Sequence, residues 1–267
     1  MKRLIALLLA GLTFTSHAQS VDDYQPDSDG DGCIGMSDLL SLLSVFGSCE
    51  AFACGESVSY QGFDYATVLI GEQCWFAENL RCENYENGDA IPLNLSASEW
   101  SNTSSGAVAV YGEGSSSCYE LSPDGNACDE AWSLNEYGRL YNWYAVDDAR
   151  GLCPSGWHVP TDGEWTVLTD HLGGEAVAGG QMKTDYGWNN GGNGTNSSGF
   201  SGLPGGYRDY GSGYFNSAGN YGSWWSSSSY GSIAWTRYLD DDSEDVYPHF
   251  NYQRFGFSVR CIQDSEE

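Results

Sequence analysis

Nine cysteines follow an N-terminal segment that has the pattern of an export signal, and this combination limits the fold more than any other feature. Disulfides persist in exported proteins and are rare in the cytosol, so we expect disulfide bonds. No two cysteines have the CxxC spacing of zinc and redox motifs. The odd number leaves at least one thiol free or paired outside the chain. Spacing leaves the connectivity open, with Cys118–Cys128 and Cys74–Cys82 as candidate local pairs.

The export signal consists of a basic start, an apolar stretch and a run of small residues. Lys2 and Arg3 precede the apolar stretch 4–14, which is too short to span a bilayer comfortably. The small residues that follow indicate a signal peptide over residues 1–18, cleaved after Ala18. No later stretch is apolar enough for a membrane helix. We therefore expect a protein that is secreted or held at the outer cell surface, without a transmembrane segment.

The chain is strongly acidic, with a formal net charge of −27, and signal-peptide cleavage would remove two basic residues and no acidic one. Binding to nucleic acid requires clustered Lys and Arg, so nucleic acid is excluded as a partner. Most acidic side chains are expected to form a solvated surface, and particular clusters are candidates for calcium binding. The chain is 40% hydrophobic, which is enough to bury a core.

Residues 27–38, DSDGDGCIGMSD, have the spacing of a twelve-residue calcium loop. Gly32 occupies the sixth position, where such a loop turns sharply. A hard cation needs several oxygen ligands from a short segment, and every ligand position is filled. The alternative is a linker rich in Asp and Gly. The predicted Ca²⁺ ligands are Asp27, Asp29, Asp31, the backbone carbonyl of Cys33, and Asp38.

The calcium loop is followed by an apolar helical face that ends at Gly47. Together they resemble a single dockerin repeat, which is a relative of the EF-hand. Dockerins that bind cohesins carry two such repeats, whereas this chain has one. The resemblance therefore implies a calcium-stiffened segment over residues 19–49 and puts a cohesin-type partner in doubt.

Residues 50–57 have the composition of a linker, and a larger domain is expected over residues 58–263. Its first part, up to Ile70, is typical of strands with a turn at Gln61-Gly62. A helix is expected over residues 138–150. A second helix is expected to begin with a capping box formed by Thr161 and Glu164.

The C-terminal half of this domain contains a long loop rich in Gly and Asn over residues 187–207. Such loops in a folded domain are usually ordered and often functional. Short strands are expected after it, at residues 222–227, 234–239 and 255–261.

Six segments of the domain, in this order, resemble the Fibrobacter succinogenes major paralogous domain. They are QCWFAENL (73–80), YGRLYNWYAV (137–146), LCPSGWHVPTDGEW (152–165), NSSGFSGLPGGYRD (196–209), WWSSS (224–228) and GFSVRC (256–261). The resemblance implies a C-type lectin-like fold of the branch that includes formylglycine-generating enzymes. That fold is α+β, with two helices, a small twisted antiparallel sheet and long loops. It also implies a disulfide between Cys153 and Cys261, and it defines no biochemical activity.

Thirteen of the 47 residues from 209 to 255 are aromatic, about twice the frequency of the whole chain. Rigid aromatic rings between Ser, Asn, Gly and Asp are typical of binding surfaces. We expect Trp224, Trp225, Trp235 and Leu239 to belong to the core. The predicted ligand-binding residues are Tyr214, Tyr221, Tyr230, Tyr238, Tyr247, His249, Phe250 and Tyr252.

The resemblance suggests a further hypothesis for residues 209–255, because some lectin-like domains of this branch vary there from copy to copy. A retroelement that mutates adenines would change the residues that lie between the positions of a constant structural frame. The alternative is an ordinary family rich in Tyr, Ser and Asp. The frame would consist of Gly222, Trp224, Trp225, Ser226, Ala234, Trp235, Arg237 and Leu239.

We found no motif that carries catalysis, so an enzyme is not expected. Neither HExxH nor GxSxG occurs, and the EPN, QPD and WND triplets of calcium-dependent lectins are absent from residues 58–263. His158 is interpreted as a structural hydrogen-bonding residue. The sequence therefore predicts a secreted or cell-surface binding or adhesion protein that recognises a glycan or an extracellular protein. The alternative is an extracellular carbohydrate-active hydrolase with paired carboxylates.

Overall fold

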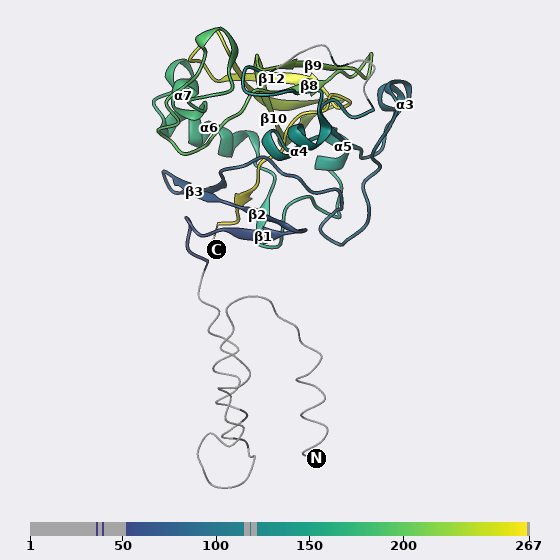
Figure 1. Cartoon of the computed structure of the whole chain (residues 1–267). Coiled ribbons are helices and arrows are strands. Elements are labelled where there is room, and N and C mark those ends of the chain that lie inside the picture. The colour runs from purple at the N-terminus through teal and green to yellow at the C-terminus, as the bar shows by residue number, and fades with distance from the viewer. Residues whose placement is uncertain (1–35, 37–38, 40–51, 115–117, 119–121, 266–267) are drawn as a thin grey trace. The chain divides into compact units, whose positions relative to one another are not determined.

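The computed structural model describes residues 36, 39, 52–114, 118 and 122–265 (Figure 1). The chain divides into two units, Met1–Phe52 and Ala53–Glu267. The predicted signal peptide and calcium loop lie outside the described residues and stay predictions. None of the helices in the described part has the length and apolar character needed to cross a bilayer.

The largest element of the second unit is a five-stranded sheet with the order β12-β11-β10-β8-β9. All neighbouring strands are antiparallel except β8 and β10, which pair in parallel at Gly206 and Gly222. The central strand β10 is buried from Gly222 to Ser226, because the cores on both faces of the sheet cover it there. The strands are β8 (Gly205–Arg208), β9 (Phe215–Ala218), β10 (Tyr221–Tyr230), β11 (Ile233–Asp240) and β12 (Tyr247–Tyr252).

A second sheet has four short strands in the order β3-β4-β13-β7, and two strand pairs complete the β-structure. The pairs are β1–β2 and β5–β6, both antiparallel. The strands of the second sheet are β3 (Thr67–Ile70), β4 (Gln73–Phe76), β7 (Trp157–His158) and β13 (Ile262–Gln263). The strands of the two pairs are β1 (Val58–Tyr60), β2 (Phe63–Tyr65), β5 (Val108–Val110) and β6 (Arg139–Tyr141).

Short helices connect the strands, and Figure 1 shows α4, α5 and α6 between the five-stranded sheet and strands β1 to β3. The predicted capping box is present at the start of α6: the Thr161 hydroxyl accepts from Glu164 N, and the Glu164 carboxylate accepts from Thr161 N. The helices are α3 (Ala97–Asn102), α4 (Glu130–Glu136), α5 (Trp143–Val146), α6 (Asp162–His171), α7 (Glu175–Met182) and the 3-10 turn η2 (Asn189–Gly191).

The expected helix over residues 138–150 is wrong. Residues Arg139–Tyr141 form β6 and pair with β5, and only the four residues Trp143–Val146 are helical. Asn142 separates the two elements, because its side chain accepts from Ala145 N and caps the short helix. All three residues of β6 are buried, so the apolar Leu140 and Tyr141 reflect burial on both sides of a strand and not one face of a helix.

Other local predictions agree more closely with the structure. Gln61 and Gly62 both have positive φ, as a tight β1–β2 hairpin turn requires. Strands β10 and β11 cover the expected segments 222–227 and 234–239. Residues 256–258 form only isolated bridges, and the strand follows them as β13. Strand β12 was not predicted.

The described disulfides join Cys54 to Cys74, Cys118 to Cys128, and Cys153 to Cys261. The bond to Cys54 means that the second half of the expected linker 50–57 is tied to β4. It also shows that the candidate pair Cys74–Cys82 is wrong. Among the described cysteines, Cys82 is the free one, and it is buried.

Three buried clusters form the core of an α+β domain with small, mostly antiparallel sheets, as the sequence predicted. One cluster includes Trp225 and the Cys153–Cys261 disulfide, and it packs around α5. A second includes Trp165 of α6 and Trp224 of β10. The third surrounds Trp100 of α3. Strands β10 and β11 both contribute to the first two clusters, whereas no residue of the edge strand β12 is fully buried.

Candidate functional site

Four of the predicted binding residues form a row across β10, β11 and β12, here called the tyrosine row: Tyr221, Tyr238, Tyr247 and His249. Tyr238 and Tyr247 are opposite each other in register and stack at 4.7 Å between ring centroids, with 14° between ring planes. Tyr221 and His249 meet Tyr238 edge-on at 6.0 and 6.3 Å. The three tyrosines are half-buried and His249 is exposed. The row ends beside Asp240, which is hydrogen-bonded to the Tyr221 hydroxyl.

The opposite face of the same strands carries a second group, here called the edge cluster: Tyr230, Trp235, Phe250 and Tyr252. Trp235 and Phe250 are paired in register with their centroids 3.8 Å apart, and Tyr230 lies 6.3 Å from Phe250. Tyr230 is 73% exposed and Tyr252 is 50% exposed. This group is therefore the more accessible of the two.

The alternation of side chains along a strand explains why the predicted residues do not share one surface. On β12, residues 247 and 249 point to one face, and residues 250 and 252 point to the other. Tyr214 lies elsewhere, just before β9, at the opposite edge of the sheet from β12. Tyr214 is 48% exposed.

The predicted frame of this region is buried, apart from one residue. Trp224, Trp225, Ala234 and Leu239 are at most 1% exposed. Trp235 was expected in the core, but it is only half-buried and belongs to the edge cluster. A buried frame is what the diversification hypothesis requires, and diversification itself stays a prediction.

Sequence reasoning missed a cleft of about 400 Å³, here called the motif cleft. Its polar lining consists of Glu78, Asn79, Arg81, Asn135, Glu136, Tyr186 and Ser201. Three of the six segments quoted above contribute to the lining, through Asn79 (73–80), Gly138 (137–146) and Ser201 (196–209).

The floor of the motif cleft is a buried polar network around Asn79. Its amide oxygen accepts from Trp224 Nε1 at 2.8 Å and from Arg260 Nε at 2.9 Å. Its amide nitrogen donates to the Tyr137 carbonyl and to Ser258 Oγ. Two further segments of the six, 224–228 and 256–261, therefore meet behind the cleft through Trp224 and Arg260.

The walls of the motif cleft carry two carboxylates, each with a hydrogen-bond donor. Glu78 forms an ion pair with Arg81. Glu136, at the end of α4, is hydrogen-bonded to the hydroxyl of Tyr186. Burial raises the pKa of Glu136, and burial together with Glu136 raises the pKa of Tyr186 to about 12. The cleft thus combines an exposed ring, amides and both signs of charge.

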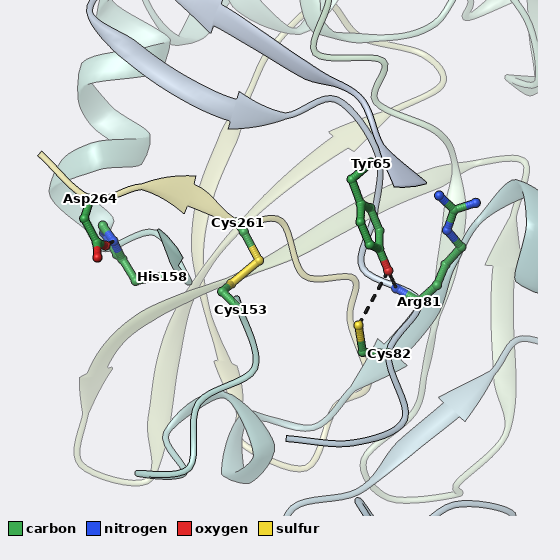
Figure 2. Close-up of a disulfide and its surroundings, with 7 residues drawn as sticks. All are labelled: Tyr65, Arg81, Cys82, Cys153, His158, Cys261 and Asp264. Atoms are coloured by element: carbon green, nitrogen blue, oxygen red, sulfur yellow. Dashed lines mark hydrogen bonds and ion pairs between the residues drawn. A yellow bond between two sulfur atoms is a disulfide. The ribbon is translucent and has the colours of Figure 1, made fainter. Parts of the chain in front are cut away.

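The predicted structural role of His158 can be seen in Figure 2, where the ring lies beside Asp264. Its two ring nitrogens lie 2.8 Å from Glu164 Oε1 and 2.6 Å from Asp264 Oδ1. Figure 2 also shows the Cys153–Cys261 disulfide, the pair that the family resemblance implies.

Within the described ranges, no group of three or more His, Cys, Asp or Glu side chains is arranged to hold a metal ion. The predicted calcium ligands Asp27, Asp29, Asp31, Cys33 and Asp38 lie outside those ranges. Their binding of Ca²⁺ stays a prediction.

The Fibrobacter succinogenes major domain family matches residues 68–263. The chain belongs to this family. No curated protein and no solved structure matches the chain. The family membership and the disulfides fit an extracellular protein of a paralogous family.

Proposed function

We propose that this protein is an extracellular binding protein that recognises a glycan through the aromatic side chains of β10, β11 and β12. The observation that supports this most directly is the edge cluster, where Tyr230 at the end of β10 and Phe250 and Tyr252 of the edge strand β12 are exposed on one face of the sheet. Contiguous exposed rings are typical of recognition surfaces. Neighbouring Ser, Asn and Asp side chains supply polar contacts, and flat rings suit stacking on sugars.

Binding of the mature protein to a glycan array and to insoluble polysaccharides tests this proposal. The double variant Tyr230→Ala/Phe250→Ala should raise the Kd by about tenfold or more, since truncation of central aromatic residues at interfaces commonly costs over about 1.4 kcal/mol. Leu69→Ala is a matched control, because Leu69 is 59% exposed and lies on β3. Binding unchanged in the double variant, or binding to extracellular proteins only, would contradict the proposal.

A carbohydrate-active hydrolase is the second candidate, and the motif cleft is the reason to keep it. Glu78 and Glu136 line the same cleft, and glycoside hydrolysis uses a pair of carboxylates. The raised pKa of Glu136 is the property that a general acid needs. Release of reducing sugar from a polysaccharide, lost in Glu136→Gln, would favour hydrolysis over binding without turnover.

A further inference from the structure

The motif cleft has the size and the rigidity of a small-molecule site. Its volume of about 400 Å³ falls within the range of roughly 300 to 1,000 Å³ that is usual for ligand pockets. Its floor is held in place, because Asn79 has partners for both of its side-chain atoms. A ligand would therefore meet groups that are already ordered, which lowers the entropic cost of binding.

The backbone is strained at one residue that lines the motif cleft. Ser201 has φ +53°, a conformation uncommon for a residue other than glycine. Asn196 holds it there by accepting from Ser201 N at 2.8 Å and donating to Ser201 Oγ at 3.0 Å. In this conformation the Ser201 carbonyl accepts from Arg260 Nη2 at 2.8 Å. Strain of this kind is often retained at functional sites.

The charges around the cleft decide which ligand class fits. Arg260 is fully buried behind the floor and Arg81 lines one wall, while Glu78 and Glu136 supply two negative charges. The signs are thus balanced. An anion would meet both carboxylates, and an apolar ligand would remove them from water without replacing their hydrogen bonds. A neutral ligand with many hydroxyl groups can donate to the carboxylates and accept from Arg81.

We propose that the motif cleft binds one or two residues of a neutral sugar, as a second site separate from the edge cluster. Tyr186 is 43% exposed and offers a ring face against which the sugar packs. Glu136 and Asn135, from the end of α4, form hydrogen bonds with its hydroxyl groups. This site does not depend on the proposed function of the sheet surface, because no edge-cluster residue lines the cleft.

Isothermal titration calorimetry of the mature protein with free glucose, galactose, mannose, xylose and N-acetylglucosamine tests the site. At least one sugar should bind with a Kd on the order of 1 mM, which corresponds to about −4.1 kcal/mol. Tyr186→Ala should raise the Kd by about tenfold, and Glu136→Gln should raise it by roughly threefold or more. Val167→Ala, at an exposed position on α6 outside the cleft, should bind as the native protein does.

Two results for the native protein and the two cleft variants would overturn this proposal. One is the absence of heat for all five sugars at concentrations well above the expected Kd. The other is unchanged binding in both Tyr186→Ala and Glu136→Gln, with each variant folded by circular dichroism. Loss of monosaccharide binding in Phe250→Ala alone would also reject the motif cleft, while supporting the sheet surface. Normal cleft binding together with no polysaccharide binding would reject only the sheet surface.

Discussion

At the scale of single residues, Arg260 shows how this fold accommodates a buried charge. It is fully buried, and its hydrogen bonds go to Asn79 Oδ1 and to the backbone carbonyls of Phe76, Phe200 and Ser201. The guanidinium also lies 4.1 Å from the centroid of the Phe200 ring. Burial lowers the pKa of Arg260 to about 9. Because neutral acceptors surround the guanidinium, the buried group keeps its hydrogen bonds.

Asn79 should therefore be among the most sensitive residues of the domain. Asn79→Ala would leave buried donors on Trp224 and Arg260 without their shared acceptor. We expect a loss of roughly 3 to 5 kcal/mol in the free energy of unfolding, because unsatisfied buried groups, charged ones above all, are costly. Urea denaturation measures this. Asn87→Ala, at an exposed turn, should change stability by less than about 0.5 kcal/mol. Equal effects of the two variants would contradict the prediction.

Cys82 is predicted to be chemically inert in the folded protein. Its thiol lies 3.6 Å from the hydroxyl of Tyr65, which in turn accepts from Arg81 N (Figure 2). Burial raises the pKa of Cys82 to about 11, so little thiolate forms at neutral pH. Iodoacetamide at pH 8 should label this thiol only after unfolding, as read by peptide mass spectrometry. Rapid labelling of Cys82 in the native protein would show that the thiol is accessible.

At the scale of elements, His158 joins three parts of the chain. It lies on β7, its Nε2 meets Glu164 of α6, and its Nδ1 meets Asp264 after β13. The hydrogen bond with Glu164, and secondarily that with Asp264, raises the pKa of His158 against the opposing effect of burial. Burial alone would raise the pKa of Glu164, but the bonds from His158 and Thr161 leave it lowered.

These shifts predict the pH dependence of stability. The raised His158 pKa means that its contribution is complete below the unfolded value of about 6.5 and is lost as pH rises through the folded value. The lowered Glu164 pKa means that this carboxylate contributes until acid protonates it below its usual range. His158→Gln should therefore cost on the order of 0.5 kcal/mol near pH 6, since the pair is partly solvent-exposed. The difference should shrink at alkaline pH. A difference that grows with pH would contradict this.

Local patterns predicted some elements and misassigned others for physical reasons. The Gln61-Gly62 turn and the Thr161–Glu164 capping box depend on neighbouring residues, so the sequence shows them directly. The strand β6 depends on pairing with β5, about thirty residues earlier, and burial on all sides hid its alternation. Strand β12 contains Pro248, which is typical of an edge strand and weakens the strand pattern.

The candidate sites show the same limit. Aromatic richness indicated the sheet surface, but the assignment of each ring to a face required the register of β11 and β12. The motif cleft could not be predicted, because Asn79, Glu136 and Tyr186 are distant in sequence and meet only in the fold. The quoted segments contained a usable indication, since residues of four of them meet at Asn79 and Ser201 of a fifth lines the same cleft.

At the scale of the whole molecule, the predicted calcium loop can be tested independently of the domain. The mature protein should bind one Ca²⁺ in calorimetry, because residues 27–38 fill every ligand position of a calcium loop. The double variant Asp29→Asn/Asp31→Asn should lose this binding and keep the thermal unfolding of the larger domain. Equal calcium affinity in the native and variant proteins would show that the ion binds elsewhere.

The place of β13 has a consequence for the order in which an exported chain can mature. Ile262–Gln263 lies between β4 and β7, so the strand that is synthesised after all the others fills the middle of its sheet. Until β13 emerges from the export machinery, β4 and β7 have no common partner strand. Cys153 likewise has no disulfide partner until Cys261, 108 positions later, has emerged. Residue 261 must therefore be translocated before oxidation can form the Cys153–Cys261 disulfide. Premature pairing of Cys153 with another cysteine is therefore the error that this topology must avoid during secretion.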